Sequence, residues 1–312
     1  MPSISRPVKP LAKVNIYDPQ KDGSREVEVC FLPDPGILVG EGNSKAVLGL
    51  DASLSMKKMY GGNQGPFDTG GAPNYVQAVA RKLGDILCNV AKSGKVQGFY
   101  WAMNPPGDGT QIIGEFDPSS WANAPVGGPK KLIEWGKGTK LLPAIRIVCE
   151  QVHAGSDWTM GVIITDGIIE DEADCIAYCL KLGKGLATGK TKPIKLVLIG
   201  VGEEVDEGQL ERFDDMFEET DLKGQVDLWS TGLVASMQDE ADILGVLYGE
   251  LMDEDTVVAP SGRIESGNGK ELKAWTDGLP GKFRFTMPKG ENTFVVQAAG
   301  KSIEQDCSEV IK

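Results

Sequence analysis

The stretch Ala46-Val47-Leu48-Gly49-Leu50-Asp51-Ala52-Ser53-Leu54-Ser55 decides the fold and contains half of a candidate site. Its first half is a continuous apolar run, which is typical of a strand that a parallel sheet buries on both faces. Its second half, Asp51-x-Ser53-x-Ser55, follows at the carboxyl end of that strand. Doubly wound sheets bind ligands beyond the carboxyl ends of their strands. We therefore expect these polar side chains to belong to a binding site.

Strand and helix patterns alternate downstream of this stretch. Short apolar runs predict strands, and apolar residues at helical spacing predict amphipathic helices between them. Such alternation is typical of an α/β fold with a doubly wound, mostly parallel sheet. The segment 117–128 is rich in Pro, Gly and Ser and is predicted to be a loop. We expect strands at 96–103, 111–116, 162–165, 194–199 and 226–229, and helices at 74–92, 141–152, 171–182, 209–217 and 239–251.

The two ends of the chain have a different pattern. Val27, Val29 and Phe31 alternate with Glu28 and Cys30, as in a strand with one buried face, and the C-terminal region contains similar alternation. Neither end has enough strands for independent stability, so we expect both ends to pair into one small antiparallel β module. The predicted domains are the N-terminal part of the β module at 1–43, the α/β domain at 44–252, and the C-terminal part of the β module at 253–312. Within the last of these, we expect 260–269 to be part of a linker and 271–275, 283–287 and 293–298 to be strands.

Bulk composition argues against two classes of partner. The formal net charge is −13, whereas nucleic acids and anionic membrane surfaces require a basic face. The first residues have no apolar signal core, and no window approaches the length of a membrane span. The six cysteines have no framework spacing, so free and mostly buried thiols are expected. On these grounds we predict a cytoplasmic protein.

The other half of the candidate site is far along the chain. Asp166 ends the predicted strand 162–165, and Thr139 follows two glycines in Gly136-Lys137-Gly138-Thr139. If the strand order is 3-2-1-4-5-6, the strands that end at Asp51 and Asp166 are neighbours. Five oxygen side chains without His or Cys favour a hard cation, Mg²⁺ first and then Mn²⁺ or Ca²⁺. The candidate metal ligands are Asp51, Ser53, Ser55, Thr139 and Asp166.

This donor set also suggests how the metal is used. Three donors are neutral hydroxyls and at most two are carboxylates. If either aspartate acts through water, the cation keeps uncompensated positive charge and can accept a carboxylate from another molecule. Structural alternatives remain open at each position. The residues Asp51, Ser53 and Ser55 are also compatible with the N-cap of a following helix, Thr139 with the N-cap of the helix 141–152, and Asp166 with a plain turn.

These residues resemble the metal-ion-dependent adhesion site of von Willebrand factor A domains. The resemblance rests on Asp51-x-Ser53-x-Ser55, the Gly-x-Gly-Thr loop that ends at Thr139, and Thr165-Asp166-Gly167, and it extends over about 46–251. It implies a Rossmann-like fold and Mg²⁺ held by the three hydroxyls, with the two aspartates binding directly or through water. The sequence departs from the family in its long Gly-rich loop after Ser55 and in Lys137 and Lys140, which flank the threonine loop.

The resemblance implies a binding module and not an enzyme. We expect an adaptor whose Mg²⁺ binds an Asp or Glu carboxylate of another protein, and association within the family suggests an ATPase as that partner. One alternative is a metal-dependent hydrolase of phosphate esters, which needs a base near Asp51, and Asp68 is the acidic residue that the Gly-rich loop offers. Another is a structural protein that assembles through its β module. Partner binding that depends on the metal would distinguish the adaptor from the structural protein. Turnover of a phosphate ester would identify the hydrolase.

Overall fold

The computed structural model describes residues 3–5, 7–8, 11–31, 43–61, 73–234, 243, 257–259, 261–276, 278–298 and 300–311. The chain divides into two compact units, one of Met1–Leu38 with Leu247–Lys312 and one of Val39–Val246. Asp68, most of the Gly-rich loop and the helix predicted at 239–251, apart from position 243, lie outside the described residues. Within the described part, no helix combines the length and the apolar character that a membrane crossing needs.

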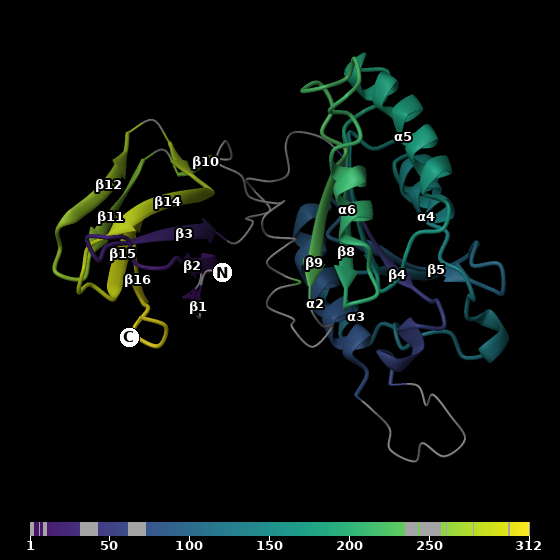
Figure 1. The fold of residues 1–312 in the computed structure, drawn as a ribbon, viewed down its shortest axis with the longest axis horizontal. Helices are drawn as coiled ribbons and strands as arrows, with labels where there is room; N and C mark the ends of the chain where they lie inside the picture. The colour runs from purple at the N-terminus through teal and green to yellow at the C-terminus, as the bar shows by residue number, and fades with distance from the viewer. Residues whose placement is uncertain are drawn as a thin grey trace. The chain divides into compact units, whose positions relative to one another are not determined.

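The unit Val39–Val246 contains a six-stranded sheet in the order β6-β5-β4-β7-β8-β9 (Figure 1). Every neighbouring pair is parallel except β5 with β6, which is antiparallel. The fold class predicted from the sequence, α/β with a mostly parallel sheet, is confirmed. The strand order is 3-2-1-4-5-6, the order that makes β4 and β7 neighbours. The strands are β4 (Ser44–Asp51), β5 (Val96–Met103), β6 (Gly109–Phe116), β7 (Trp158–Thr165), β8 (Ile194–Val201) and β9 (Trp229–Val234).

Helices cover both faces of this sheet. Figure 1 shows α2 on one side of the strands and α4 with α5 on the other. Asn74 caps α2, because its side-chain oxygen accepts a hydrogen bond from the Gln77 amide at 2.8 Å. The longer helices are α2 (Tyr75–Val90), α5 (Glu172–Ala187) and α6 (Glu207–Asp214); shorter helical segments are η1 (Met56–Lys58), α3 (Pro118–Trp121), η2 (Leu132–Glu134), α4 (Leu142–Arg146) and the π-helical η3 (Ile147–Val152).

Strand β4 lies at the centre of the sheet, between β5 and β7. Its residues alternate between the two layers, so Val47 belongs to the core cluster that includes residues of α4, α5 and α6. Gly49 lies opposite Phe99, and a Cβ added to Gly49 would be only 2.7 Å from the tip of that ring. The central strand therefore needs a glycine there to let the aromatic ring pack over it, and its carboxyl end emerges at Asp51.

Several predicted elements need correction. The predicted loop 117–128 contains α3, whose Trp121 is 1% exposed. The predicted helix 141–152 changes from α to π geometry after Arg146. The predicted strand 226–229 ends where the observed strand β9 begins. The predicted linker 260–269 contains a strand that pairs on both sides.

The other unit consists of antiparallel strands from both ends of the chain. One four-stranded sheet has the order β1-β2-β3-β14, and the other has the order β12-β11-β15-β16. Strand β14 pairs with β3, so Phe283 lies opposite Val29 in the register. The strands are β1 (Ser3–Ser5), β2 (Leu11–Ile16), β3 (Arg25–Phe31), β11 (Gly262–Ser266), β12 (Glu271–Trp275), β14 (Lys282–Met287), β15 (Thr293–Ala298) and β16 (Lys301–Asp306), with the short pair β10 (Val257–Ala259) and β13 (Leu279–Pro280).

Aromatic rings join the two sheets. Phe285 of β14 meets Phe294 of β15 edge-on at 5.0 Å between ring centroids, and Phe283 meets Trp275 of β12 at 4.8 Å. The two sheets therefore share one apolar core, to which the N-terminal and C-terminal strands both contribute.

All six cysteines of the chain are free, and five of them are buried, as predicted.

A buried polar row connects β2, β3 and β14. Glu28 is 8% exposed, accepts a hydrogen bond from Asn15 at 3.1 Å, and accepts from the Arg284 guanidinium at 2.8 Å. Arg284 also pairs with Glu26 at 3.0 Å. Since β2 and β3 come from one end of the chain and β14 from the other, this row holds the two ends together.

Replacing Arg284 with alanine should lower the free energy of unfolding of this unit by about 2 kcal/mol, because the Glu28 carboxylate then stays buried without its cation. Hydrogen exchange of the β3 amides measures the loss. Arg263→Ala is the matched control, since Arg263 pairs with Glu265 on the surface and should contribute at most about 1 kcal/mol. Equal protection factors in the two variants would contradict the prediction.

Candidate functional site

The buried aspartate at the end of β4 anchors the candidate site. Asp51 is fully buried, and both of its carboxyl oxygens accept hydrogen bonds. One oxygen accepts from the backbone amide of Ser53 at 2.7 Å, and the other accepts from the hydroxyl of Thr165 at 2.7 Å. Thr165 is the last residue of β7, so the predicted adjacency of β4 and β7 directly fixes the aspartate.

The two serines connect Asp51 to Asp166. The hydroxyl oxygens of Ser53 and Ser55 are 2.9 Å apart. Ser55 donates to a carboxyl oxygen of Asp166 at 2.8 Å, and Ser53 lies 3.5 Å from the same oxygen. Four of the five predicted residues thus form one hydrogen-bonded cluster at the carboxyl edge of the sheet.

The fifth residue, Thr139, approaches from the loop that precedes α4. Gly136 bridges to Ser53 as in a parallel ladder: its amide donates to Ala52 at 3.0 Å, and its carbonyl accepts from Leu54 at 2.8 Å. Thr139 is 7% exposed, and its hydroxyl oxygen lies 3.4 Å from the position that a Cβ on Gly167 would occupy. The fold therefore brings all five predicted residues to one edge.

Burial dominates the electrostatics of this cluster. Burial, together with the neighbouring Asp166, raises the pKa of Asp51 to about 7. Burial also raises the pKa of Asp166, against the opposing effects of the Ser55 hydrogen bond and of Lys58. Among the described ion pairs none involves either aspartate. Two buried carboxyls that repel each other are what a divalent cation would stabilise.

The pKa of Asp51 predicts a pH dependence of stability in the presence of a chelator. The carboxyl titrates near 3.8 when unfolded and near 7 when folded, so the folded state holds more protons between these values. The contribution of Asp51 to the free energy of unfolding should then be largest below pH 4 and fall as the pH rises to about 7.

Urea unfolding from pH 4 to pH 8 measures this slope. Asp51→Asn is the matched variant, because it keeps the shape and removes the titration. The difference between the two proteins isolates Asp51 from His153, whose pKa burial lowers and whose contribution has the opposite sign. Parallel curves for wild type and variant would contradict the prediction.

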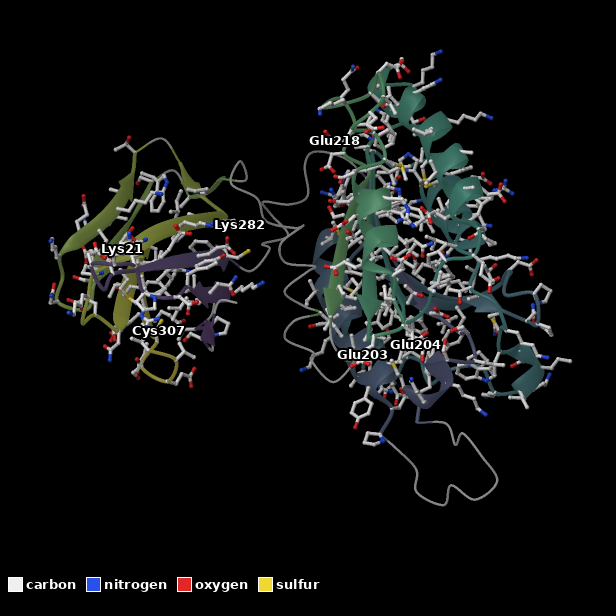
Figure 2. All side chains as sticks on the ribbon, in the orientation of Figure 1. Lys21, Glu203, Glu204, Glu218, Lys282 and Cys307 are labelled. Atoms are coloured by element: carbon white, nitrogen blue, oxygen red, sulfur yellow. The ribbon has the colours of Figure 1, made fainter. Side chains whose placement is uncertain are left out.

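Sequence reasoning missed several residues around the site. Tyr60 is buried, and its hydroxyl donates to the backbone carbonyl of Asp51 at 2.9 Å. The Glu170 amide donates to the Thr139 carbonyl at 2.9 Å. Figure 2 shows Glu203 and Glu204 in the loop after β8, and the charge of Glu204 acts on Asp166. No motif marks these positions, because each acts through a backbone contact or at long range.

The donors at this edge are mainly hydroxyls. Among the described residues, no group of three or more His, Cys, Asp or Glu side chains is placed to hold a metal ion. A site here therefore depends on Ser53, Ser55 and Thr139 to complete an oxygen donor set with two carboxyls. The alternative catalytic base, Asp68, lies outside the described residues.

Neither a protein-family model nor a curated protein matches the sequence. Solved structures that the chain resembles include the PilB minor pilin from Streptococcus sanguinis, at 10% identity and a TM-score of 0.40, over 79% of this chain and 80% of that chain. Another is proximal thread matrix protein 1 from the mussel byssus, with a zinc-occupied MIDAS motif, at 14% identity and a TM-score of 0.43, over 72% of this chain and 48% of that chain.

A third similar structure is the pilus adhesin RrgA from Streptococcus pneumoniae, at 11% identity and a TM-score of 0.34. The similarity covers 97% of this chain and 62% of that one. The predicted cytoplasmic location is contradicted by these matches, because the similar structures include a minor pilin and a pilus adhesin, and that prediction is withdrawn.

Proposed function

We propose that the chain is a metal-dependent protein-binding module of the von Willebrand factor A type. In this proposal a divalent cation is held by Asp51, Ser53, Ser55, Thr139 and Asp166. The observation that supports it most is the cluster of two buried, mutually repelling carboxyls with two serine hydroxyls hydrogen-bonded between them. Oxygen-only donors fit Mg²⁺ best, with Mn²⁺ and Ca²⁺ as alternatives.

The cation would supply a positive charge that binds a carboxylate of the partner. Asp51, fixed by hydrogen bonds from Thr165 and from the Ser53 amide, would contribute negative charge to the site. Asp166, directly after β7, would contribute a second negative charge. The hydroxyls would contribute none, so a cation that bound either aspartate through water would keep uncompensated positive charge for the partner's carboxylate. The partner we propose is a protein that presents an Asp or Glu side chain, of which an ATPase is one example. The binding domain would be 44–252, inserted between the β segments 1–43 and 253–312.

Thermal melts with Mg²⁺, Mn²⁺, Ca²⁺ or EDTA test the metal site. A cation that binds only the folded state at 100 times its Kd adds about 2.7 kcal/mol of stability, so the wild-type melting temperature should rise. Asp51→Ala and Thr139→Ala should both lose this rise. Ser93→Ala, at an exposed turn that precedes β5, should keep it. Identical wild-type melts in all four conditions would overturn the proposal.

A further inference from the structure

Exposed apolar side chains gather on the loops that build the site. Of the described large hydrophobic residues in this unit, Leu132 is 66% exposed, Ile133 is 70% exposed and Leu54 is 39% exposed. Leu54 lies between the two serines of the cluster. Leu132 and Ile133 come four and three residues before Gly136, which is hydrogen-bonded to Ala52 and Leu54, so chain length keeps them within about 14 Å of that glycine. Apolar groups left in water beside a binding site favour contact with a partner.

Lysines are frequent in the segments that contain these apolar residues. The segments 52–61 and 122–140 contain six lysines and one acidic residue, Glu134, although the whole chain has a net charge of −13. Glu134 pairs with Lys131 at 3.6 Å, and the Lys131 side chain stays 77% exposed. Lys58 is exposed and near enough to Asp166 to lower its pKa. This local excess of positive charge contrasts with the acidic surface elsewhere.

Acidic residues also border the site. Glu170 follows β7, and a Cβ on Gly138 would meet its carboxylate oxygen at 2.6 Å. Glu203 and Glu204 follow β8 (Figure 2). An acidic ligand is thus attracted by the lysines of the segments 52–61 and 122–140 and repelled by these glutamates, which follow β7 and β8.

We propose that the partner is an acidic and apolar protein segment that lies across a basic–apolar rim, defined as Leu54, Lys58, Lys131, Leu132, Ile133 and Lys137. The inference deepens the proposed function and rests on it. One carboxylate of the segment would bind the cation. Further acidic residues of the segment would pair with the lysines of the rim, and its apolar side chains would cover Leu132 and Ile133. The charge complementarity of the rim selects this occupant over a basic or purely apolar one.

A random 12-residue peptide library displayed on phage is the probe, selected on the immobilised full chain in Mg²⁺ and in EDTA. Wild type in Mg²⁺ should select peptides that combine two or more acidic residues with Leu, Ile or an aromatic residue. Two double variants test the rim. One combines Lys131→Glu with Lys137→Glu, and the other combines Leu132→Ser with Ile133→Ser. Each should weaken the binding of the best synthetic peptide about tenfold. The control is the double variant Lys184→Glu with Lys190→Glu. Both lysines are exposed and lie near the C-terminal end of α5, which is the end of the helix remote from the site.

The outcomes separate the rim from the metal. Acidic peptides that need Mg²⁺ but bind both rim variants as tightly as wild type would overturn the rim and leave the proposed function standing. Peptides that the rim variants lose but that bind equally in EDTA would support the rim and count against metal-dependent docking. Selection of basic peptides, or no enrichment over an uncoated surface, would overturn the proposed partner chemistry.

Discussion

Gly136→Ala is expected to lower the free energy of unfolding by roughly 3 kcal/mol and to abolish stabilisation by Mg²⁺. A Cβ at this position would lie 1.9 Å from the Ala102 carbonyl oxygen, which is backbone and cannot move aside as a side chain does. The loop must shift, and its two hydrogen bonds with Ala52 and Leu54 are lost with it. Thr139 is three residues further along the same loop, so the site opens as the loop moves.

The neighbouring glycine supplies a matched control. In Gly138→Ala the new Cβ meets only the flexible Glu170 carboxylate, at 2.6 Å, which can rotate away. We expect this variant to unfold within about 1 kcal/mol of wild type and to keep its response to Mg²⁺. Hydrogen exchange of β4 amides and melts with Mg²⁺ or EDTA measure both effects. If the two alanine variants behaved alike, the backbone clash at Gly136 would not be the cause.

Trp121→Ala should cost about 3–5 kcal/mol, since it empties the space of a large, fully buried side chain. The indole lies on α2 at Gly84, where an added Cβ would meet ring atoms at 2.3 Å, and its centroid is 5.2 Å from that of Phe116. The loss should appear in the hydrogen exchange of β5 and α2. Trp275→Ala, in the other unit and at a partly exposed position, should leave that exchange unchanged. A loss below 1 kcal/mol for Trp121→Ala would contradict this packing.

The sequence predicts the sheet best where its residues are buried on both faces. The predicted strand 96–103 has the observed bounds of β5, because a run of apolar residues leaves one interpretation. Strand β11 was missed, since Ile264 is the only large apolar residue between Gly262 and Ser266, and its pairing partners are remote in sequence. The helix α5 continues past its predicted end because Gly183 packs against Phe217, a tertiary contact that outweighs low helix propensity.

The candidate site shows the same division between local pattern and tertiary contact. The sequence predicts Asp51, Ser53 and Ser55 because they form the polar end of an apolar strand. It predicts Asp166 because this residue ends the neighbouring strand. The bridge from Gly136 to Ser53, which brings in Thr139, has no local signal, because it joins residues that are far apart in the sequence. The rim was also missed, since exposure of Leu132 and Ile133 is a property of the fold and not of their residue type.

The antiparallel pairing of β3 with β14 has a mechanical consequence. Arg25 opens β3 and lies opposite Met287, the last residue of β14, so the chain enters and leaves this ladder at the same point of the register. Tension applied to the chain before β3 and after β14 is carried across these two paired strands. The α/β unit is inserted between β3 and β14 in the sequence and lies outside that load path, so the geometry of its candidate site is protected from the applied force until the β3–β14 ladder separates.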